Sequence, residues 1–241
     1  IWKNPTLSSP ILSRSGKFLA ATSPFKGRMN LLVMDLETRK GTLLTSFEDF
    51  DVINVSWVGD ERLVFSLGLA NSPTGAGQFD GGGLFVVNRD GSGARRLAPT
   101  VRETRARNQY VYRSLELHRT IPGNTDEVIA EGNQTSADSI DLYRLNLNTG
   151  RTTLITSGRP SDLTLEWLLD SKLTPRVVVA GVKDELTRVV YYRASAESPW
   201  EELARYSRDK GSVFVPLAFE SDDQTLQVAT NNGRDTMAVF R

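Results

Sequence analysis

Serine-type hydrolysis needs a serine on a strained turn, a histidine beside it and an acid behind the histidine. The sequence contains no Gly-x-Ser-x-Gly turn, and Gly91-Ser92-Gly93 is too short and falls in an expected hairpin turn. His118 is the single histidine, and the stretch around it, Ser114–His118, alternates like a strand. We expect a packed or surface histidine at this position. The sequence therefore predicts no catalytic residue in this chain.

Metal and cofactor chemistry has little support in the composition. Cysteine is absent, which removes thiolate nucleophiles, disulfides and cysteine-based zinc sites. A single histidine excludes zinc sites built from two or three histidines. Asn88–Ser92 lacks the alternating acids and closing glutamate of a calcium loop, so we interpret it as a hairpin turn. We expect no metal and no cofactor.

A glycine-rich stretch, Gly68–Gly82, is the first candidate for recognition. It does not fit Gly-x-x-x-x-Gly-Lys-Ser/Thr and fits Gly-x-Gly-x-x-Gly poorly, so a phosphate cradle is not indicated. One interpretation is a connection between two strands. The other is a ligand-contacting loop, in which Gln78, Phe79 and Asp80 would be the substrate-binding residues.

An arginine-rich stretch, Thr100–Tyr110, is the second candidate. The forked guanidinium groups of Arg102, Arg105 and Arg107 suit carboxylates, so these side chains could hold a peptide terminus. The alternative is a solvated linker between two repeating units. Nucleic-acid binding is not expected, because Glu103 interrupts the run and the chain has 29 basic and 29 acidic residues.

Targeting signals are scarce. No apolar run approaches the roughly 18 residues of a membrane span, and we expect no such span. The sequence begins at Ile1 rather than methionine, which we interpret as a processed protein or a fragment. The compartment, periplasmic, secreted or cytoplasmic, stays unassigned.

Short runs rich in valine, leucine, isoleucine and aromatic residues, separated by Gly, Asn, Asp and Pro, predict strands throughout. The best helix candidate, Trp200–Tyr206, fits a strand equally well. Two stretches align without a gap: LLVMDLETRKGTLLTS, Leu31–Ser46, and LYRLNLNTGRTTLITS, Leu142–Ser157. We interpret them as the same strand–turn–strand hairpin in two repeating units.

Four strands in roughly 40–50 residues is the period of a β-propeller blade. We predict an all-β fold, a β-propeller of four-stranded antiparallel blades in one domain, residues 1–241, as a fragment of a larger propeller. It has about five blades, at approximately 11–46, 52–99, 113–157, 163–206 and 213–241, and the last lacks its fourth strand. A β-sandwich or two small β domains is the alternative. An open propeller edge would favour homodimers.

A series of short motifs continues along nearly the whole chain. The motifs are Trp2–Pro5, Ser13–Lys17, Val55–Val58, Asp60–Phe65, Gly83–Ser92, Asp141–Asn146, Thr149–Arg151 and Asn231–Arg241. In this order they resemble the N-terminal propeller domain of the prolyl oligopeptidase family of bacterial serine peptidases, which includes dipeptidyl and acylaminoacyl peptidases. Arg14 and Ser15 depart from the Pro and Asp of the family's Ser-Pro-Asp-Gly turn.

The resemblance implies a non-catalytic domain that gates access and sorts peptides for a C-terminal α/β-hydrolase domain lying outside this chain. The implied partners are that domain and peptide substrates, and many bacterial relatives are exported. The alternative is a stand-alone protein-binding propeller without enzymatic activity, like the periplasmic propeller of the Tol system.

Overall fold

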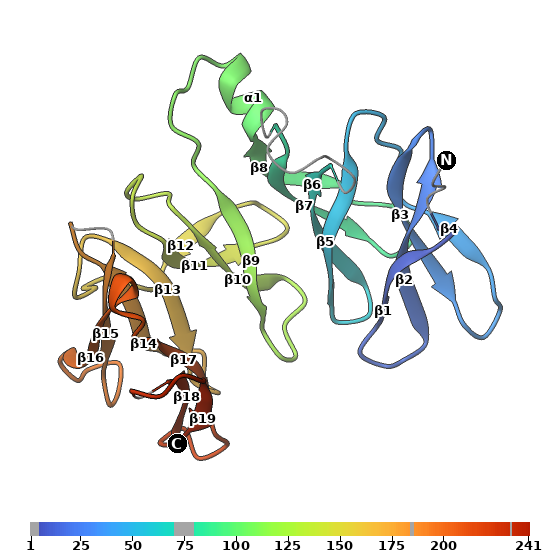
Figure 1. Ribbon diagram of the computed structural model, residues 1–241. Coiled ribbons are helices and arrows are strands. Elements are labelled where there is room, and N and C mark those ends of the chain that lie inside the picture. The colour runs from blue at the N-terminus through green and yellow to red at the C-terminus, as the bar shows by residue number, and fades with distance from the viewer. Residues whose placement is uncertain (1–4, 70–79, 184–185, 232) are drawn as a thin grey trace. The chain divides into compact units, whose positions relative to one another are not determined.

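A computed structural model describes residues 5–69, 80–183, 186–231 and 233–241. Within these residues the chain forms four four-stranded antiparallel sheets and one three-stranded sheet, in sequence order. Very little of this part is helical (Figure 1). The prediction of five blade-like sheets, the last without a fourth strand, is confirmed.

The strand bounds follow the turn signals of the sequence. The first sheet comprises β1 (Ser8–Leu12), β2 (Phe18–Phe25), β3 (Arg28–Asp35) and β4 (Gly41–Leu43). The second comprises β5 (Asp51–Val58), β6 (Arg62–Gly68), β7 (Gly82–Asn88) and β8 (Arg95–Thr100). The third comprises β9 (Leu115–Thr120), β10 (Glu127–Gly132), β11 (Asp141–Asn146) and β12 (Thr152–Leu154). The fourth comprises β13 (Thr164–Leu169), β14 (Pro175–Gly181), β15 (Thr187–Tyr192) and β16 (Glu201–Ser207), and the fifth comprises β17 (Phe214–Phe219), β18 (Leu226–Thr230) and β19 (Ala238–Phe240).

Strand β16 resolves an ambiguity of the sequence, and two short helical segments were not predicted. The ambiguous stretch at Trp200 is a strand, because β16 pairs with β15 along its length. A helix that the sequence analysis did not predict, α1 (Val101–Ala106), follows β8 directly, and a short 3-10 turn (Arg208–Lys210) follows β16.

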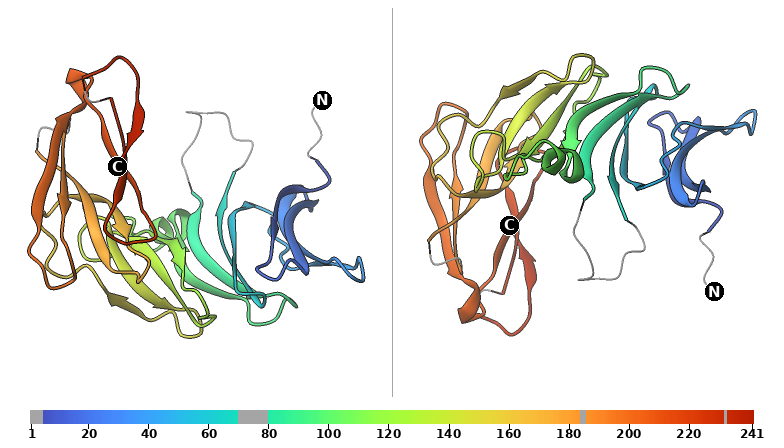
Figure 2. Two further views of the ribbon diagram at one scale, coloured as in Figure 1. Left: turned by 90° about the horizontal axis from the view of Figure 1, so that it is seen from below. Right: turned by 90° about the horizontal axis from the view of Figure 1, so that it is seen from above.

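The chain divides into two compact units. One contains residues 1–131 and 144–153, and the other contains residues 132–143 and 154–241. In the first unit, β5 packs against β1, β2 and β3, so the first two sheets lie side by side (Figure 2). Their interface buries Leu31, Val33, Trp57 and Leu63. In the second unit, Val177, Val179 and Val190 form a core against partly buried side chains of the fifth sheet.

The two aligned stretches, Leu31–Ser46 and Leu142–Ser157, form the same hydrogen-bonding arrangement. The Thr45 hydroxyl donates to the Asn30 side-chain oxygen at 2.9 Å and accepts the Leu31 amide at 2.9 Å. In the second copy, the Thr156 hydroxyl donates to Asp141 at 2.9 Å and accepts the Leu142 amide at 3.2 Å. Asn30 and Asp141 are fully buried, so each needs these partners. The repeated sequence pattern therefore specifies how the third and fourth strands of these two sheets are joined.

Candidate functional site

Residues 80–82, the described end of the glycine-rich stretch, meet α1 of the arginine-rich stretch at one end of the second sheet. Residues 69–81 connect β6 to β7, and α1 begins where β8 ends. In an antiparallel sheet of sequential strands, these two connections leave from the same end of the strands. The tight turns between β5 and β6 and between β7 and β8 lie at the opposite end. The long β6–β7 connection and helix α1 therefore leave this sheet at one end of its strands.

Helix α1 is held by a capping box. The Thr100 hydroxyl accepts the Glu103 amide at 3.2 Å, and the Glu103 carboxylate accepts the Thr100 amide at 2.8 Å. Glu103 also pairs with Arg96 of β8. The Thr-x-x-Glu spacing was the sequence signal for this helix, and it was missed because the following six residues are too short to show a helical period.

Asp80 joins the end of the glycine-rich stretch to α1. Its carboxylate pairs with Arg105 and lies 3.8 Å from Arg102. The backbone repeats the connection, since the Arg102 amide donates to the Asp80 carbonyl at 3.0 Å and the Val101 amide donates to the Gly81 carbonyl at 2.8 Å. A Cβ atom at Gly81 would lie 2.5 Å from the Leu67 carbonyl oxygen, so this close approach to β6 requires glycine.

The six sequence-predicted binding residues have different outcomes. Asp80, Arg102 and Arg105 lie together in this cluster. Arg107, at the C-terminal cap of α1, is exposed and takes no part in it. Gln78 and Phe79 lie outside the described residues.

A cavity of about 440 Å³ opens beside this cluster. Phe47, Phe50 and Phe85 supply apolar walls, and the charged lining residues are Arg102 and three acids, Glu48, Asp49 and Glu103. Arg102 pairs with Asp49 at 2.8 Å and lies 4.4 Å from the centre of the Phe50 ring. Sequence reasoning missed Asp49 and Phe50, because they precede β5 and contact Arg102 of α1 across more than 50 residues of sequence, with no local signal. The cavity suits an apolar side chain flanked by hydrogen-bonding groups.

His118 is partly buried and lies beside two glutamates, Glu116 and Glu131. Its Nδ1 atom lies 2.8 Å from the Glu131 carboxylate, as expected for a packed histidine. Partial burial and the charge of Glu131 raise the pKa of the nearby Glu116 carboxyl above its ordinary value. In the part of the chain that the structure describes, no serine hydroxyl is hydrogen-bonded to His118.

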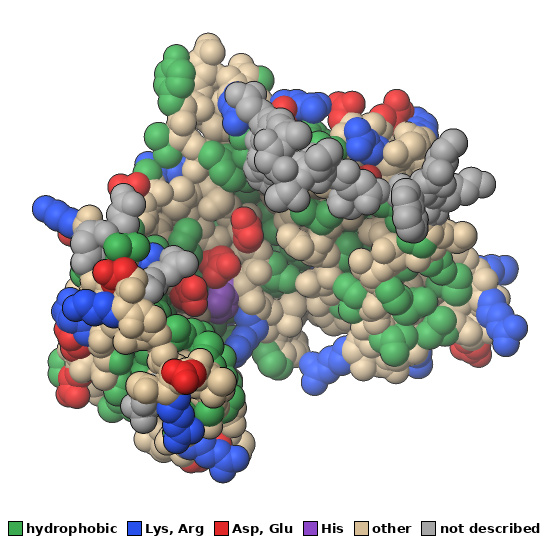
Figure 3. Space-filling model, in the orientation of Figure 1, with side chains coloured by type: hydrophobic (Ala, Val, Ile, Leu, Met, Phe, Trp, Pro, Cys, Tyr) green, Lys and Arg blue, Asp and Glu red, His purple; other side chains and the backbone are tan. Residues whose placement is uncertain are grey.

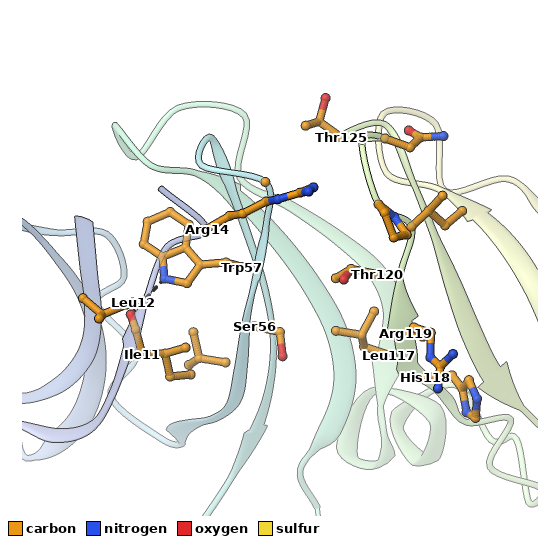
Figure 4. A pocket seen from close by; sticks show the side chains of 16 residues that line it. Ile11, Leu12, Arg14, Ser56, Trp57, Leu117, His118, Arg119, Thr120 and Thr125 are labelled. Carbon is orange, nitrogen blue, oxygen red and sulfur yellow. Dashed lines mark hydrogen bonds between the residues drawn. The ribbon is translucent and has the colours of Figure 1, made fainter. Parts of the chain in front are cut away.

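A second cavity, of about 740 Å³, lies between β1, β5, β9 and the turn after β9 (Figure 4). All of its lining residues belong to the first unit. Trp57 stands on one wall with its Nε1 atom donating to the Ile11 carbonyl at 3.0 Å. Leu117 and Thr120 of β9 face it across the cavity.

Charge on the visible face is mixed, with acidic and basic side chains interspersed (Figure 3). Among the residues that the structure describes, no group of three or more acidic or histidine side chains is placed to hold a metal ion. Within the same ranges, no helix has the length and apolar character needed to cross a membrane.

Solved structures share this arrangement of sheets. The fold is a β-propeller fold. Dipeptidyl peptidase 4 of Porphyromonas gingivalis aligns with 97% of this chain at 9% identity and a TM-score of 0.60. One of two prolyl endopeptidases studied for inter-domain dynamics aligns with 98% at 14% identity and 0.57. An oligogalacturonate lyase in complex with manganese aligns with 98% at 10% identity and 0.56.

These likenesses concern the fold. The propeller chain spans 37% of the dipeptidyl peptidase, 34% of the prolyl endopeptidase and 65% of the lyase. No protein-family model and no curated protein sequence matches the chain. The expected likeness to propellers of prolyl-oligopeptidase-type enzymes is thus confirmed in structure, at low sequence identity.

Proposed function

We propose that this propeller is a non-catalytic recognition domain that gates access and sorts peptides for a serine peptidase of the prolyl oligopeptidase type. The α/β-hydrolase domain that cleaves the peptide would lie outside residues 1–241. The propeller's part is steric and electrostatic: it excludes folded proteins and orients short peptides.

The observation that carries the proposal is the convergence of Asp80, Arg102 and Arg105 beside an apolar cavity. The first and third sheets share one hairpin as scaffold, whereas residues 80–82 of the glycine-rich stretch and α1 of the arginine-rich stretch lie together at this place. Long connections on a rigid sheet scaffold are where proteins commonly carry recognition. The ordered sequence motifs and the fold shared with two peptidases support the choice of peptide as ligand.

The full-length polypeptide that contains this chain provides the test. We expect a fluorophosphonate probe to label it stoichiometrically, and to leave residues 1–241 alone unlabelled, because the nucleophile would lie in the hydrolase domain. In the full-length enzyme, R105Q should raise KM for peptides several-fold while kcat for a small ester stays unchanged, because the ester needs no sorting.

Arg151 provides the matched control, since it is also an exposed arginine but lies on the turn between β11 and β12. R151Q should leave both kinetic constants unchanged. Labelling of residues 1–241 alone, or identical KM values for R105Q and wild type, would contradict the proposal.

A stand-alone binding propeller is the second candidate, favoured by the occurrence of the fold in a protein that is not a peptidase. The coding sequence after Arg241 separates the two. About 250 further residues with a Gly-x-Ser-x-Gly turn, then Asp and His, would support the peptidase domain. A stop codon after one or two more blades would support the stand-alone protein.

A further inference from the structure

The cavity of about 740 Å³ between β1, β5 and β9 combines apolar walls with two arginine side chains. Its walls are mostly apolar, and Leu12 there keeps 57% of its surface exposed. Leu117 and Trp57 extend this apolar surface on opposite sides (Figure 4). A volume of about 740 Å³ lies within the range of roughly 300–1,000 Å³ that is usual for ligand sites.

The only charged side chains lining this cavity, besides the titratable His118, are two arginines. Arg14 extends from the end of β1 across the cavity, and Arg119 lies on β9 at the opposite wall (Figure 4). No aspartate or glutamate is among the lining residues. Within the described ranges, neither guanidinium has an ion pair or a hydrogen bond. Arg62 and Arg89 of the same unit are, by contrast, paired with Asp126 and Glu61.

Three acidic groups near the cavity, Asp60, Asp126 and Glu131, are already engaged. The Asp60 carboxylate accepts the Ser15 amide at 2.9 Å, directly beside Arg14. Asp126 lies 3.4 Å from Arg62, and Glu131 lies 2.8 Å from His118. Arg14 and Arg119 are therefore left with positive charge directed at a partly apolar space.

We propose that this cavity binds an acidic peptide segment. Two carboxylates of the peptide pair with Arg14 and Arg119, and an apolar residue between them packs against Leu12 and Leu117. Asn124 and Thr120, which also line the cavity, offer hydrogen-bonding groups to the peptide backbone. The proposal depends on the first unit alone and holds equally for a peptidase domain and for a stand-alone propeller.

Isothermal titration of residues 1–241 tests the proposal with a tripeptide, acetyl-Glu-Leu-Glu-amide, and its neutral counterpart, acetyl-Gln-Leu-Gln-amide. The acidic peptide should bind, and raising the salt from 50 to 500 mM should weaken binding, because ion pairs near the surface are screened. R14Q and R119Q should each lower its affinity about threefold to tenfold. Neither variant should change affinity for the neutral peptide.

R151Q removes an exposed arginine elsewhere in the same unit and should bind like wild type. Circular dichroism and thermal melting of each variant keep a folding defect apart from lost binding. Equal affinity for the two peptides, or unchanged affinity in R14Q and R119Q, would overturn the proposal. Succinate binding as tightly as the acidic peptide would overturn the peptide assignment. None of these readouts involves hydrolysis, so the result is independent of the peptidase proposal.

Discussion

At the scale of single residues, the two copies of the hairpin use different side chains, Asn30 and Asp141, to accept the hydrogen bond of the threonine hydroxyl. Asn30 donates to the carbonyls of Phe25 and Phe47 and stays neutral. Asp141, at the matching position, is a buried charge and pairs with Arg159. A buried charge without a partner costs several kcal/mol, so the aspartate is tolerated because the arginine accompanies it. Both copies keep the hydrogen bond from the threonine hydroxyl. Whether the accepting residue is asparagine or aspartate depends on its other partners, two carbonyls in one copy and an arginine in the other.

The turn of the same hairpin gives a residue-scale prediction. Arg39 adopts a φ of 57°, whereas the second copy places Gly150 there with a φ of 74°. A side chain in this left-handed region is strained, and Arg39 is exposed. We expect R39G to raise the free energy of unfolding by about 0.5–1 kcal/mol, after the greater freedom of glycine in the unfolded chain is subtracted.

Urea denaturation measures this change, and G150A is the reciprocal control. It places a side chain in the same strained conformation and should lower stability by about 1 kcal/mol. A destabilised R39G protein would mean that the arginine side chain makes a favourable contact that outweighs the strain.

At the scale of elements, α1 depends on one ionised carboxyl. Burial alone would raise the pKa of Glu103, but the Thr100 hydrogen bonds and the Arg96 charge outweigh it and leave the pKa below its ordinary value. A lowered carboxyl pKa stabilises the folded state above the unfolded-state pKa, and this contribution disappears as the pH falls through the folded-state value.

Glu103 should therefore contribute to stability at pH 7, and this contribution should fall as the pH drops below the ordinary glutamate pKa. We expect E103Q to be less stable than wild type by about 0.5 kcal/mol at pH 7, since the carboxyl is partly exposed and its ion pair is weakened by solvent. As the pH falls from the unfolded-state pKa through the lowered folded-state pKa, the melting temperatures of the two proteins should converge, because Glu103 becomes neutral. A difference that does not shrink on acidification would show that shape, and not charge, explains the effect.

Elements proved easier to predict than the site. Apolar alternation and turn residues were sufficient for the strands around Val33, Val86 and Leu145, because each strand is a local pattern. The stretch at Trp200 was ambiguous, since only pairing with β15 decides it. The pairing of Asp80 with Arg105 could not be predicted from the sequence, because it depends on two connections that leave the same end of the strands. Arg14 and Arg119 gave no sequence signal, since their importance lies in the absence of partners.

At the scale of the whole molecule, the fifth sheet has an open edge. Among the residues that the structure describes, the third strand of each of the first four sheets pairs on both sides, whereas β19 pairs only with β18. Val239 in the middle of β19 is 62% exposed, and the preceding Met237 is 52% exposed. Unpaired backbone groups beside exposed apolar side chains are a template for pairing with a second chain.

We therefore expect residues 1–241 to form dimers through β19 at micromolar concentration. V239K should shift the protein toward monomer, because a lysine on an edge strand opposes strand pairing. Light scattering coupled to size-exclusion chromatography measures the mass of both proteins. L203K is the matched control, since Leu203 is an exposed leucine on the outer strand β16 and lies on another sheet. If L203K dissociates the dimer and V239K does not, the interface lies on the fourth sheet. If wild type is a monomer at every concentration tested, the open edge of β19 is not used for self-association.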